Sequence, residues 1–233
     1  MQAMDIVAVN TNAVHLMRQG SFQKAIFFFR AALRELHLIT GVQKQNMKTT
    51  PSDEVEVSRT FRQVRSVPLG DSLSHLKPSI YQDHDAFSIF DRAFLIDSSD
   101  LISIHSIEGQ NYATTVLLFN MGLAYQLLGM QDFRSQSTNL KKAMKIYQMT
   151  AAMLENSGDE ENGLIYLALS NNMSHIYTHF CETQESQRCL DCLQEKLIAM
   201  HNSNVEMLAD EFRAFQMNVL LLHRKRAVAA AAA

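Results

Sequence analysis

The stretch that decides the fold reads Leu118-Phe119-Asn120-Met121-Gly122-Leu123-Ala124-Tyr125. A small residue, Gly122, precedes a large one, Tyr125, by three positions, and Ala143 precedes Tyr147 by four positions further on. Residues three or four apart share one face of a helix, so the pattern predicts two helices that approach closely, small side chain against large. We expect this helix pair over residues 111–155.

The same pattern of small and large residues occurs twice more. The N-terminal copy predicts a helix pair over residues 5–38, and the C-terminal copy predicts one over residues 159–200. Gly20 lies between the two expected N-terminal helices, where a helix C-terminus commonly needs glycine. The residues of the two copies are Ala13, Leu16, Ala25 and Phe29, and Ser174, Tyr177, Ser186 and Leu190.

A last helix is expected over residues 202–224, because apolar residues recur there at steps of three and four. One apolar stripe backed by charged residues is typical of a capping helix, whose outer face meets water. The alanine run over residues 227–233 is a low-complexity tail.

Residues 41–86 contain all three prolines of the chain and keep no apolar period. We interpret this segment as a disordered linker or insertion. Two β-branched runs surround a polar turn in residues 87–107, which fits a small β-hairpin or, alternatively, a loop packed on the helices.

The composition indicates an intracellular helical protein. Hydrophobic residues make up 47% of the 233 residues, and the net charge is −3, so no overall basic field favours nucleic acid or an anionic membrane. The apolar stretch from Tyr112 to Met130 is interrupted by Asn120 and Gln126, and we expect it not to span a membrane. Three cysteines, all within residues 181–192, do not make a secreted disulfide scaffold.

We therefore expect a cytoplasmic location. The basic run His223-Arg224-Lys225-Arg226 has two interpretations. It is either a nuclear address or a set of cations that interact favourably with a helix C-terminus.

These features resemble tetratricopeptide repeats, and the third copy is similar to the longer repeats of kinesin light chains. The resemblance implies a mainly α fold of stacked antiparallel helix pairs, an α-solenoid, forming one helical domain over residues 1–226. It also implies a non-catalytic scaffold or adaptor that binds a peptide or protein segment in a concave groove lined by the first helix of each pair.

Carried over to this chain, the groove places Asn120 and Asn172 where some members of the family use asparagines to hold a peptide backbone. An amide donates and accepts together, which suits it to a backbone partner. The alternative is that both asparagines tie one helix to its neighbour. The full set of groove candidates is Asn10, Val14, Met17, Phe119, Asn120, Leu123, Leu127, Asn171, Asn172, His175 and His179.

The search for catalytic chemistry finds no phosphate-binding glycine loop and no nucleophile motif, so we expect neither an enzyme nor a cofactor. The residues that suggest zinc are His175, His179, Cys181, Cys189 and Cys192. Cys189 and Cys192 fall inside an apolar-periodic helix, without the loop that zinc sites use, and we expect no metal site.

Two further features remain open. Arg62, Arg65, Ser66 and Pro68 form a basic serine–proline patch that phosphorylation could turn into a docking site. Phe27, Phe28 and the last helix could instead make the chain a self-associating subunit of a larger helical assembly, which is the alternative to a groove-binding adaptor. The identity of the partner protein is not encoded in any motif.

Overall fold

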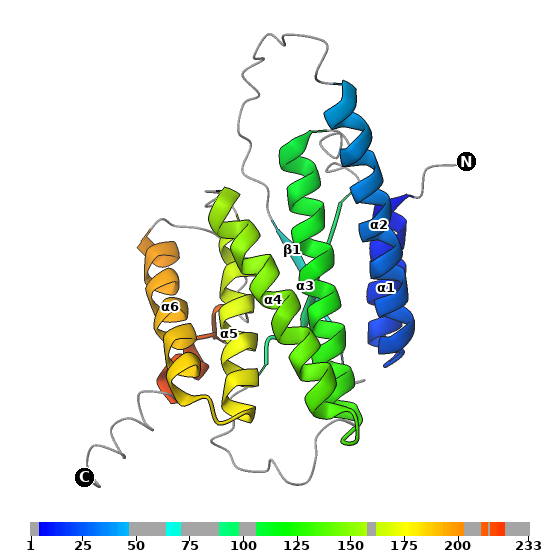
Figure 1. Cartoon of the computed structure of the whole chain (residues 1–233). Helices are drawn as coiled ribbons and strands as arrows, with labels where there is room; N and C mark the ends of the chain where they lie inside the picture. The colour runs from blue at the N-terminus through cyan, green and yellow to red at the C-terminus, as the bar shows by residue number, and fades with distance from the viewer. Residues whose placement is uncertain are drawn as a thin grey trace, which may run out of the picture. The chain divides into compact units, whose positions relative to one another are not determined.

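The computed structural model describes residues 5–46, 64–70, 89–97, 106–157, 162–202, 211–213 and 215–221 (Figure 1). The chain is mainly α-helical and carries one small two-stranded antiparallel sheet. The elements are α1 (Ile6–Arg18), α2 (Phe22–Asn46), β1 (Arg65–Pro68), β2 (Arg92–Leu95), α3 (Ile107–Gln131), α4 (Gln136–Ser157), α5 (Gly163–His179) and α6 (Thr183–Asn202).

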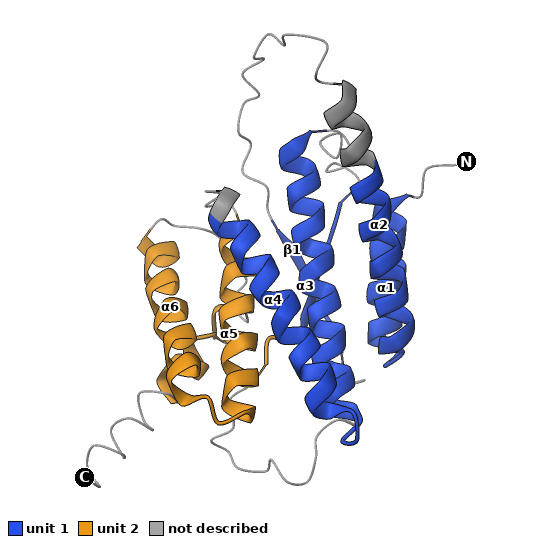
Figure 2. Cartoon of the chain, viewed as in Figure 1, with its two compact units in different colours: residues 1–72, 92–161 blue, residues 73–91, 162–233 orange. Residues whose placement is uncertain are grey.

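The chain divides into two compact units, coloured separately in Figure 2. Unit 1 comprises residues 1–72 and 92–161, and therefore holds α1 to α4 and the sheet. Unit 2 comprises residues 73–91 and 162–233, and holds α5, α6 and the helical residues 211–213 and 215–221. The expectation of one solenoid domain over residues 1–226 stays a prediction.

Helix α1 ends with a glycine cap, as the sequence predicts. Gly20 has φ +70°, its N–H bonds the carbonyl of Met17 at 2.9 Å, and the N–H of Ser21 bonds the carbonyl of Leu16 at 2.9 Å. This is the pairing of a Schellman motif, and glycine adopts its left-handed backbone without steric cost. The chain then enters α2, which packs against α1 and continues eight residues beyond the expected end at residue 38.

The second pair confirms the close approach of small and large residues. A Cβ at Gly122 of α3 would lie 2.6 Å from the ring of Tyr147 on α4, so the two helices touch where only a hydrogen fits. The connecting turn is short: α3 ends at Gln131 and α4 begins at Gln136. The Oδ2 of Asp132 accepts a hydrogen bond from Ser135 Oγ at 2.7 Å, which fixes this turn.

Helix α3 is the core helix of unit 1. It packs against α1, α2, α4 and β2, and most of its residues are buried. By length and composition α3 could cross a membrane, a property that it shares with core helices of soluble proteins. Most of its apolar part is buried inside the protein, so its length and composition are weak evidence for a membrane span.

The sheet corrects two expectations from the sequence. A strand is present within the expected hairpin of residues 87–107, but this strand, β2, pairs with β1 in antiparallel register, Arg65 opposite Leu95 and Pro68 opposite Arg92. Strand β1 lies inside residues 41–86, which were expected to be linker throughout, and the end of α2 lies there as well. The rest of that linker, residues 98–105 and the alanine tail lie outside the described residues, and α3 already begins at Ile107.

Candidate functional site

The site in unit 1 is a pair of buried asparagine amides that hold one backbone residue of the chain itself. Asn120 Oδ1 accepts a hydrogen bond from the N–H of Phe94 at 2.9 Å, and Asn120 Nδ2 donates to the carbonyl of Phe94 at 2.8 Å. Asn10 Nδ2 donates to the same carbonyl at 3.1 Å, and Asn120 Nδ2 also donates to Asn10 Oδ1 at 3.0 Å. We call Asn10 and Asn120 the first clamp.

The first clamp is fully closed to solvent. Asn10 and Asn120 are both 0% exposed, as is the Phe94 side chain that they hold in place. The Phe94 ring lies against Phe119, with 4.8 Å between the ring centroids, and Phe119 in turn lies 5.7 Å from Tyr147. The amides therefore fix the backbone of residue 94 while the aromatic rings fix its side chain.

Unit 2 contains an equivalent arrangement, which we call the second clamp. Asn172 Oδ1 accepts from the N–H of Phe90 at 2.8 Å, and Asn172 Nδ2 donates to the carbonyl of Phe90 at 3.1 Å. Asn171 Nδ2 donates to Asn172 Oδ1 at 3.3 Å, and Asn218 Nδ2 donates to Asn171 Oδ1 at 2.6 Å. The Phe90 ring stacks on Phe215 with the centroids 5.1 Å apart.

In both clamps the asparagine occupies the same position relative to the small residue of its helix. Asn120 lies two residues before Gly122, and Asn172 lies two residues before Ser174, the small residue of its own helix. Ser174 Oγ hydrogen-bonds Ser186 Oγ across α5 and α6 at 2.8 Å, so this small residue also marks a close helix contact. The same offset turns Asn120 toward Phe94 of β2 and Asn172 toward Phe90, two residues before β2.

The clamps can bind a backbone without reading its sequence. Each amide pairs with the donor and the acceptor of one residue, and every residue except proline offers both. The asparagines therefore do hold a peptide backbone, but it belongs to residues 90 and 94 of the same chain. Asn120 also makes the helix-to-helix tie that was the alternative, because its Nδ2 donates to Asn10 Oδ1 of α1 at 3.0 Å.

The other predicted groove residues are distributed as follows. Phe119 joins the first clamp and Asn171 joins the second, as described above. Four apolar candidates are buried in unit 1, and the two histidines are partly buried on α5; these are Val14, Met17, Leu123 and Leu127, and His175 and His179.

Three residues that complete the clamps were missed by the sequence analysis: Phe90, Phe94 and Asn218. Phe90 and Phe94 are two large apolar residues four apart in a segment rich in hydrophobic side chains, and that isolated pair is the signal that could have identified them. Asn218 is a polar residue beside the apolar stripe of the last helix and is 1% exposed, which no local pattern indicates.

Two titratable groups, one on α5 and one on α6, are perturbed. Desolvation lowers the pKa of His175 from 6.5 to about 4, and the nearby His179 acts in the same direction. Burial raises the pKa of the Cys189 thiol from 9.0 to about 12, with further increases from Cys192 and Glu185. His175 is therefore neutral at pH 7, and Cys189 is a protonated thiol without nucleophilic character.

Within the described residues, no group of three or more His, Cys, Asp or Glu side chains is arranged to hold a metal ion. Cys181 and Cys192 are exposed and Cys189 is partly buried. The structure also places the serine of the basic serine–proline patch. Ser66 is buried in β1, where its Oγ accepts a hydrogen bond from Arg92 Nε at 2.7 Å, so it is not accessible to a kinase in the folded chain.

Comparison with known proteins returns no match: no protein-family model, no curated protein and no solved structure is significantly similar to the chain. The resemblance to tetratricopeptide repeats therefore rests on the sequence pattern alone.

Proposed function

We propose that this chain is a non-catalytic protein-interaction scaffold that binds an extended segment of a partner protein through its asparagine clamps. The observation that supports the proposal is the bidentate pairing of Asn120 with the backbone of Phe94. Paired amide bonds to an extended backbone, together with a pocket for one large side chain, are the features by which peptide-binding surfaces recognise their ligands.

In the free chain the clamps are filled by residues 90 and 94, so a partner segment has to replace them. The internal segment is covalently tethered and therefore present at high effective concentration, which makes it a strong competitor. Binding of a partner is then controlled by how firmly Phe94 is held. A partner that carries a large aromatic residue in an extended segment is the best match to the first clamp.

The test uses a fluorescein-labelled peptide with the sequence of Ile89 to Asp97, and its polarisation reports binding to the full chain. We expect weak binding to the wild type and tighter binding to Phe94→Ala, because the internal competitor has lost its aromatic anchor. Adding Asn120→Ala to this variant should abolish binding. Asn111→Ala, an exposed asparagine on the same helix, is the matched control and should have no effect.

Phe94→Leu serves as a milder second variant in case Phe94→Ala unfolds, since truncating a buried phenylalanine costs about 3–5 kcal/mol. Helicity by circular dichroism establishes that each variant is folded. A folded Phe94→Leu or Phe94→Ala chain that does not bind the peptide would show that residues 89–97 are a permanent part of the core, and would overturn the proposal.

A second candidate is self-association through α2. Phe27 is 67% exposed and its ring meets Phe28 edge-on, with 5.9 Å between centroids, so an apolar surface is available on this helix. Light scattering over a concentration series tests it. A rise in molar mass that Phe27→Gln removes would favour assembly, whereas a constant monomer mass would exclude it.

A further inference from the structure

A second binding feature lies on unit 1, around Tyr125 of α3. Arg30 Nη2, from α2, donates a hydrogen bond to the Tyr125 hydroxyl. The Arg30 guanidinium carbon lies 5.8 Å from the centroid of the Tyr125 ring, and Lys142 Nζ, from α4, lies 5.6 Å from the same centroid. Two cations from two helices are thus brought to one ring.

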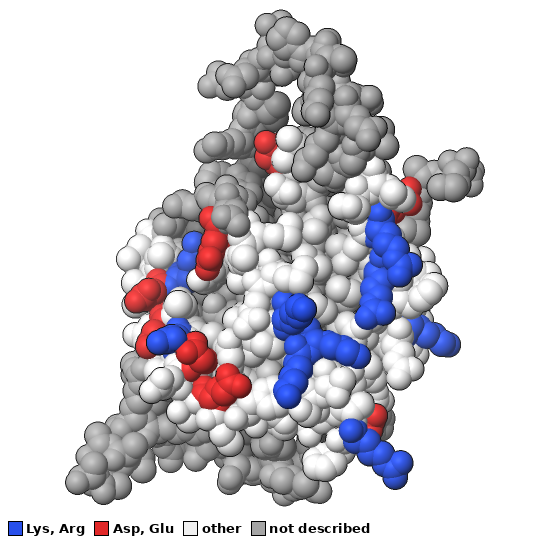
Figure 3. Space-filling view, in the orientation of Figure 1, with Lys and Arg blue, Asp and Glu red and all other residues white. Residues whose placement is uncertain are grey.

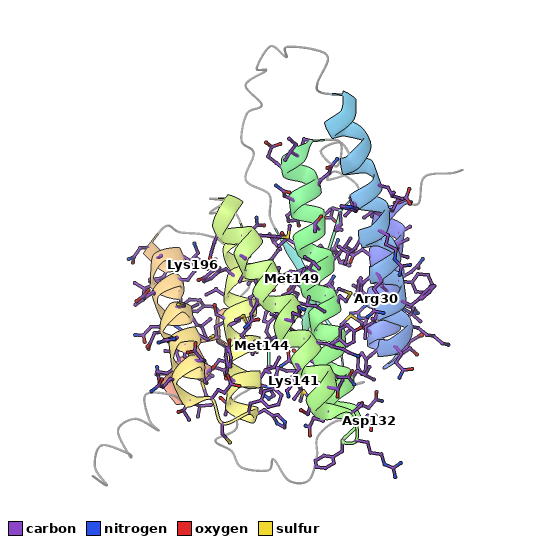
Figure 4. The ribbon with its side chains drawn as sticks, in the orientation of Figure 1. Arg30, Asp132, Lys141, Met144, Met149 and Lys196 are labelled. Atoms are coloured by element: carbon purple, nitrogen blue, oxygen red, sulfur yellow. The ribbon has the colours of Figure 1, made fainter. Side chains whose placement is uncertain are left out.

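More cations surround this pair. Arg34 follows Arg30 by one turn of α2, while Lys141 and Lys145 flank Lys142 on α4, and all five side chains are exposed. We call these five residues with Tyr125 the cation patch. Figure 4 shows Arg30 and Lys141 on the two helices that border α3, and Figure 3 shows Lys and Arg atoms gathered over α2 and α4 with no Asp or Glu between them.

Neither Arg30 nor Lys142 forms an ion pair with another residue that the structure describes. Like charges that approach one ring repel each other, and the chain as a whole is acidic, with a net charge of −3. Such an accumulation of positive charge is stabilised by an external anion.

The cation patch also has the pre-organisation of a site. The hydrogen bond to the buried Tyr125 orients the Arg30 guanidinium, and the ring restrains Lys142 by a cation–π contact. A fixed guanidinium can bind a carboxylate through two parallel hydrogen bonds, and a lysine beside it adds charge. Tyr125 and Asn120 lie about 140° apart around α3, so the patch does not face the first clamp.

The chemistry of the patch favours an acidic protein segment. A single-stranded nucleic acid bound through its bases needs an exposed aromatic ring to stack on, but Tyr125 is only 5% exposed and offers no ring face. A membrane surface requires a broad apolar face, whereas the exposed apolar side chains beside these cations are separate residues on two helices, Phe27 and Leu38 on α2 and Met149 on α4. Glu and Asp side chains with an apolar neighbour meet both features.

We propose that the cation patch is a docking site for an Asp/Glu-rich segment of a partner protein, with a carboxylate bound between Arg30 and Lys142. This site is separate from the clamps and does not depend on them. Binding is electrostatic and therefore weakens as the salt concentration rises.

The experiment measures binding of a fluorescein-labelled peptide of alternating Glu and Ser residues to the full chain by polarisation, at low and at physiological salt. We expect Arg30→Gln with Lys142→Gln to reduce the affinity about tenfold or more. The matched control, Arg188→Gln with Lys196→Gln on α6, removes the same charge and should leave the affinity within about twofold of wild type.

Tyr125→Phe tests the geometry of the site without changing the net charge of the chain. It keeps the ring and removes the hydroxyl that orients Arg30, so we expect a severalfold loss of affinity with an unchanged charge. Circular dichroism and thermal melting establish that each variant is folded.

Three results would overturn the proposal. The first is no binding of the acidic peptide to the wild type, and the second is an equal loss from the control pair, which indicates a diffuse field rather than a site. The third is a preference for a single-stranded oligonucleotide or for anionic phospholipid vesicles over the peptide, which assigns the patch to another class of partner. Failure of the clamp proposal leaves all three readouts unchanged, because the peptide here contains no aromatic residue.

Discussion

At the scale of single residues, the central fact is that one asparagine satisfies both hydrogen-bonding groups of one backbone residue. Asn120 provides an acceptor for the N–H of Phe94 and a donor for its carbonyl. Aspartate would lose the donor. Alanine would remove the amide acceptor of the Phe94 N–H and one of the two amide donors to the Phe94 carbonyl, which keeps Asn10 Nδ2. A buried polar group without a partner costs more than the hydrogen bond itself contributes.

We therefore predict that Asn120→Ala lowers the free energy of unfolding by about 2–4 kcal/mol, because it removes the three buried hydrogen bonds that Asn120 makes with Phe94 and Asn10. Urea denaturation followed by circular dichroism measures it. Asn111→Ala, on the exposed face of the same helix, should change the stability by less than about 0.5 kcal/mol. Similar losses from both variants would contradict the role of the clamp.

His175 predicts a dependence of stability on pH. Its folded-state pKa of about 4 is below its ordinary value of 6.5, because desolvation disfavours the charged ring. The unfolded chain takes up the proton first, so the contribution of His175 is fully present above pH 6.5 and is lost as the pH falls toward 4. Between pH 7 and pH 5 we expect a loss of about 1–2 kcal/mol from this residue.

Urea denaturation of the wild type and of His175→Gln at both pH values tests this dependence. The variant cannot be protonated at position 175, so its stability should change less over this interval. An identical pH dependence of the two proteins would show that His175 is protonated as readily in the folded chain as in the unfolded one.

Cys181 follows the C-terminus of α5 as Gly20 follows that of α1, but its left-handed backbone is strained because it carries a side chain. It has φ +60°, its N–H bonds the carbonyl of Thr178, and the N–H of Glu182 bonds the carbonyl of Tyr177, so it ends α5 as Gly20 ends α1. A side chain disfavours this left-handed backbone by about 1 kcal/mol. We predict that Cys181→Gly raises the melting temperature and that Gly20→Ala lowers it, measured by differential scanning calorimetry.

At the scale of elements, helix pairs were predictable because their signal is local. The apolar period places the ends of the three helix pairs within a few residues, except that α2 continues eight residues beyond its expected end. The small residues Gly122 and Ser174 mark the contacts within their pairs. The final helix is present at residues 211–213 and 215–221, inside the expected range of 202–224. Regular stacking of the pairs is a non-local property, and it stays a prediction.

The sheet was not predictable because its two strands are short and far apart. Each has four residues, and the pairing of Ser66 with Phe94 joins positions that no short-range pattern connects. Strand preference at this length depends on what covers the strand. Here β2 is covered by α1 and α3, which supply the buried surface that four residues alone cannot supply.

The contact between α3 and α4 makes a prediction at this scale. Gly122→Ala should destabilise the chain by about 1–3 kcal/mol, because the new methyl group overlaps the Tyr147 ring and overpacking outweighs the gain in helix propensity. Tyr147→Leu in the same chain should recover part of this loss. Additive losses in the double variant would place the clash elsewhere.

At the scale of the whole molecule, the sequence identified the asparagines but not what they hold. Asn10, Asn120 and Phe94 come from three separate segments, and only the folded chain brings them together. The family resemblance suggested a bound peptide, and a pattern in one chain does not distinguish a foreign segment from an internal one. The candidate site was therefore found in part, and its occupant was missed.

The burial of α3 predicts where unit 1 resists opening. Backbone amides in the middle of α3, between Val116 and Leu127, should exchange hydrogen more slowly than those of α1 or α4, because α3 is surrounded by other elements. Hydrogen exchange followed by mass spectrometry measures this order. Faster exchange in α3 than in α1 would contradict its role as the core helix.

The hydrogen bonds between Asn10, Phe94 and Asn120 have a consequence for the newly made protein. Asn10 leaves the ribosome first, yet its partner amide lies 110 positions later in the chain. At about 5–20 residues per second, this interval lasts on the order of ten seconds. Throughout it, α1 has no α3 to cover it, and the aromatic side chain of residue 94 is in the same state for the last 26 positions of the interval. The nascent chain therefore passes through a period in which these apolar surfaces are accessible to chaperones.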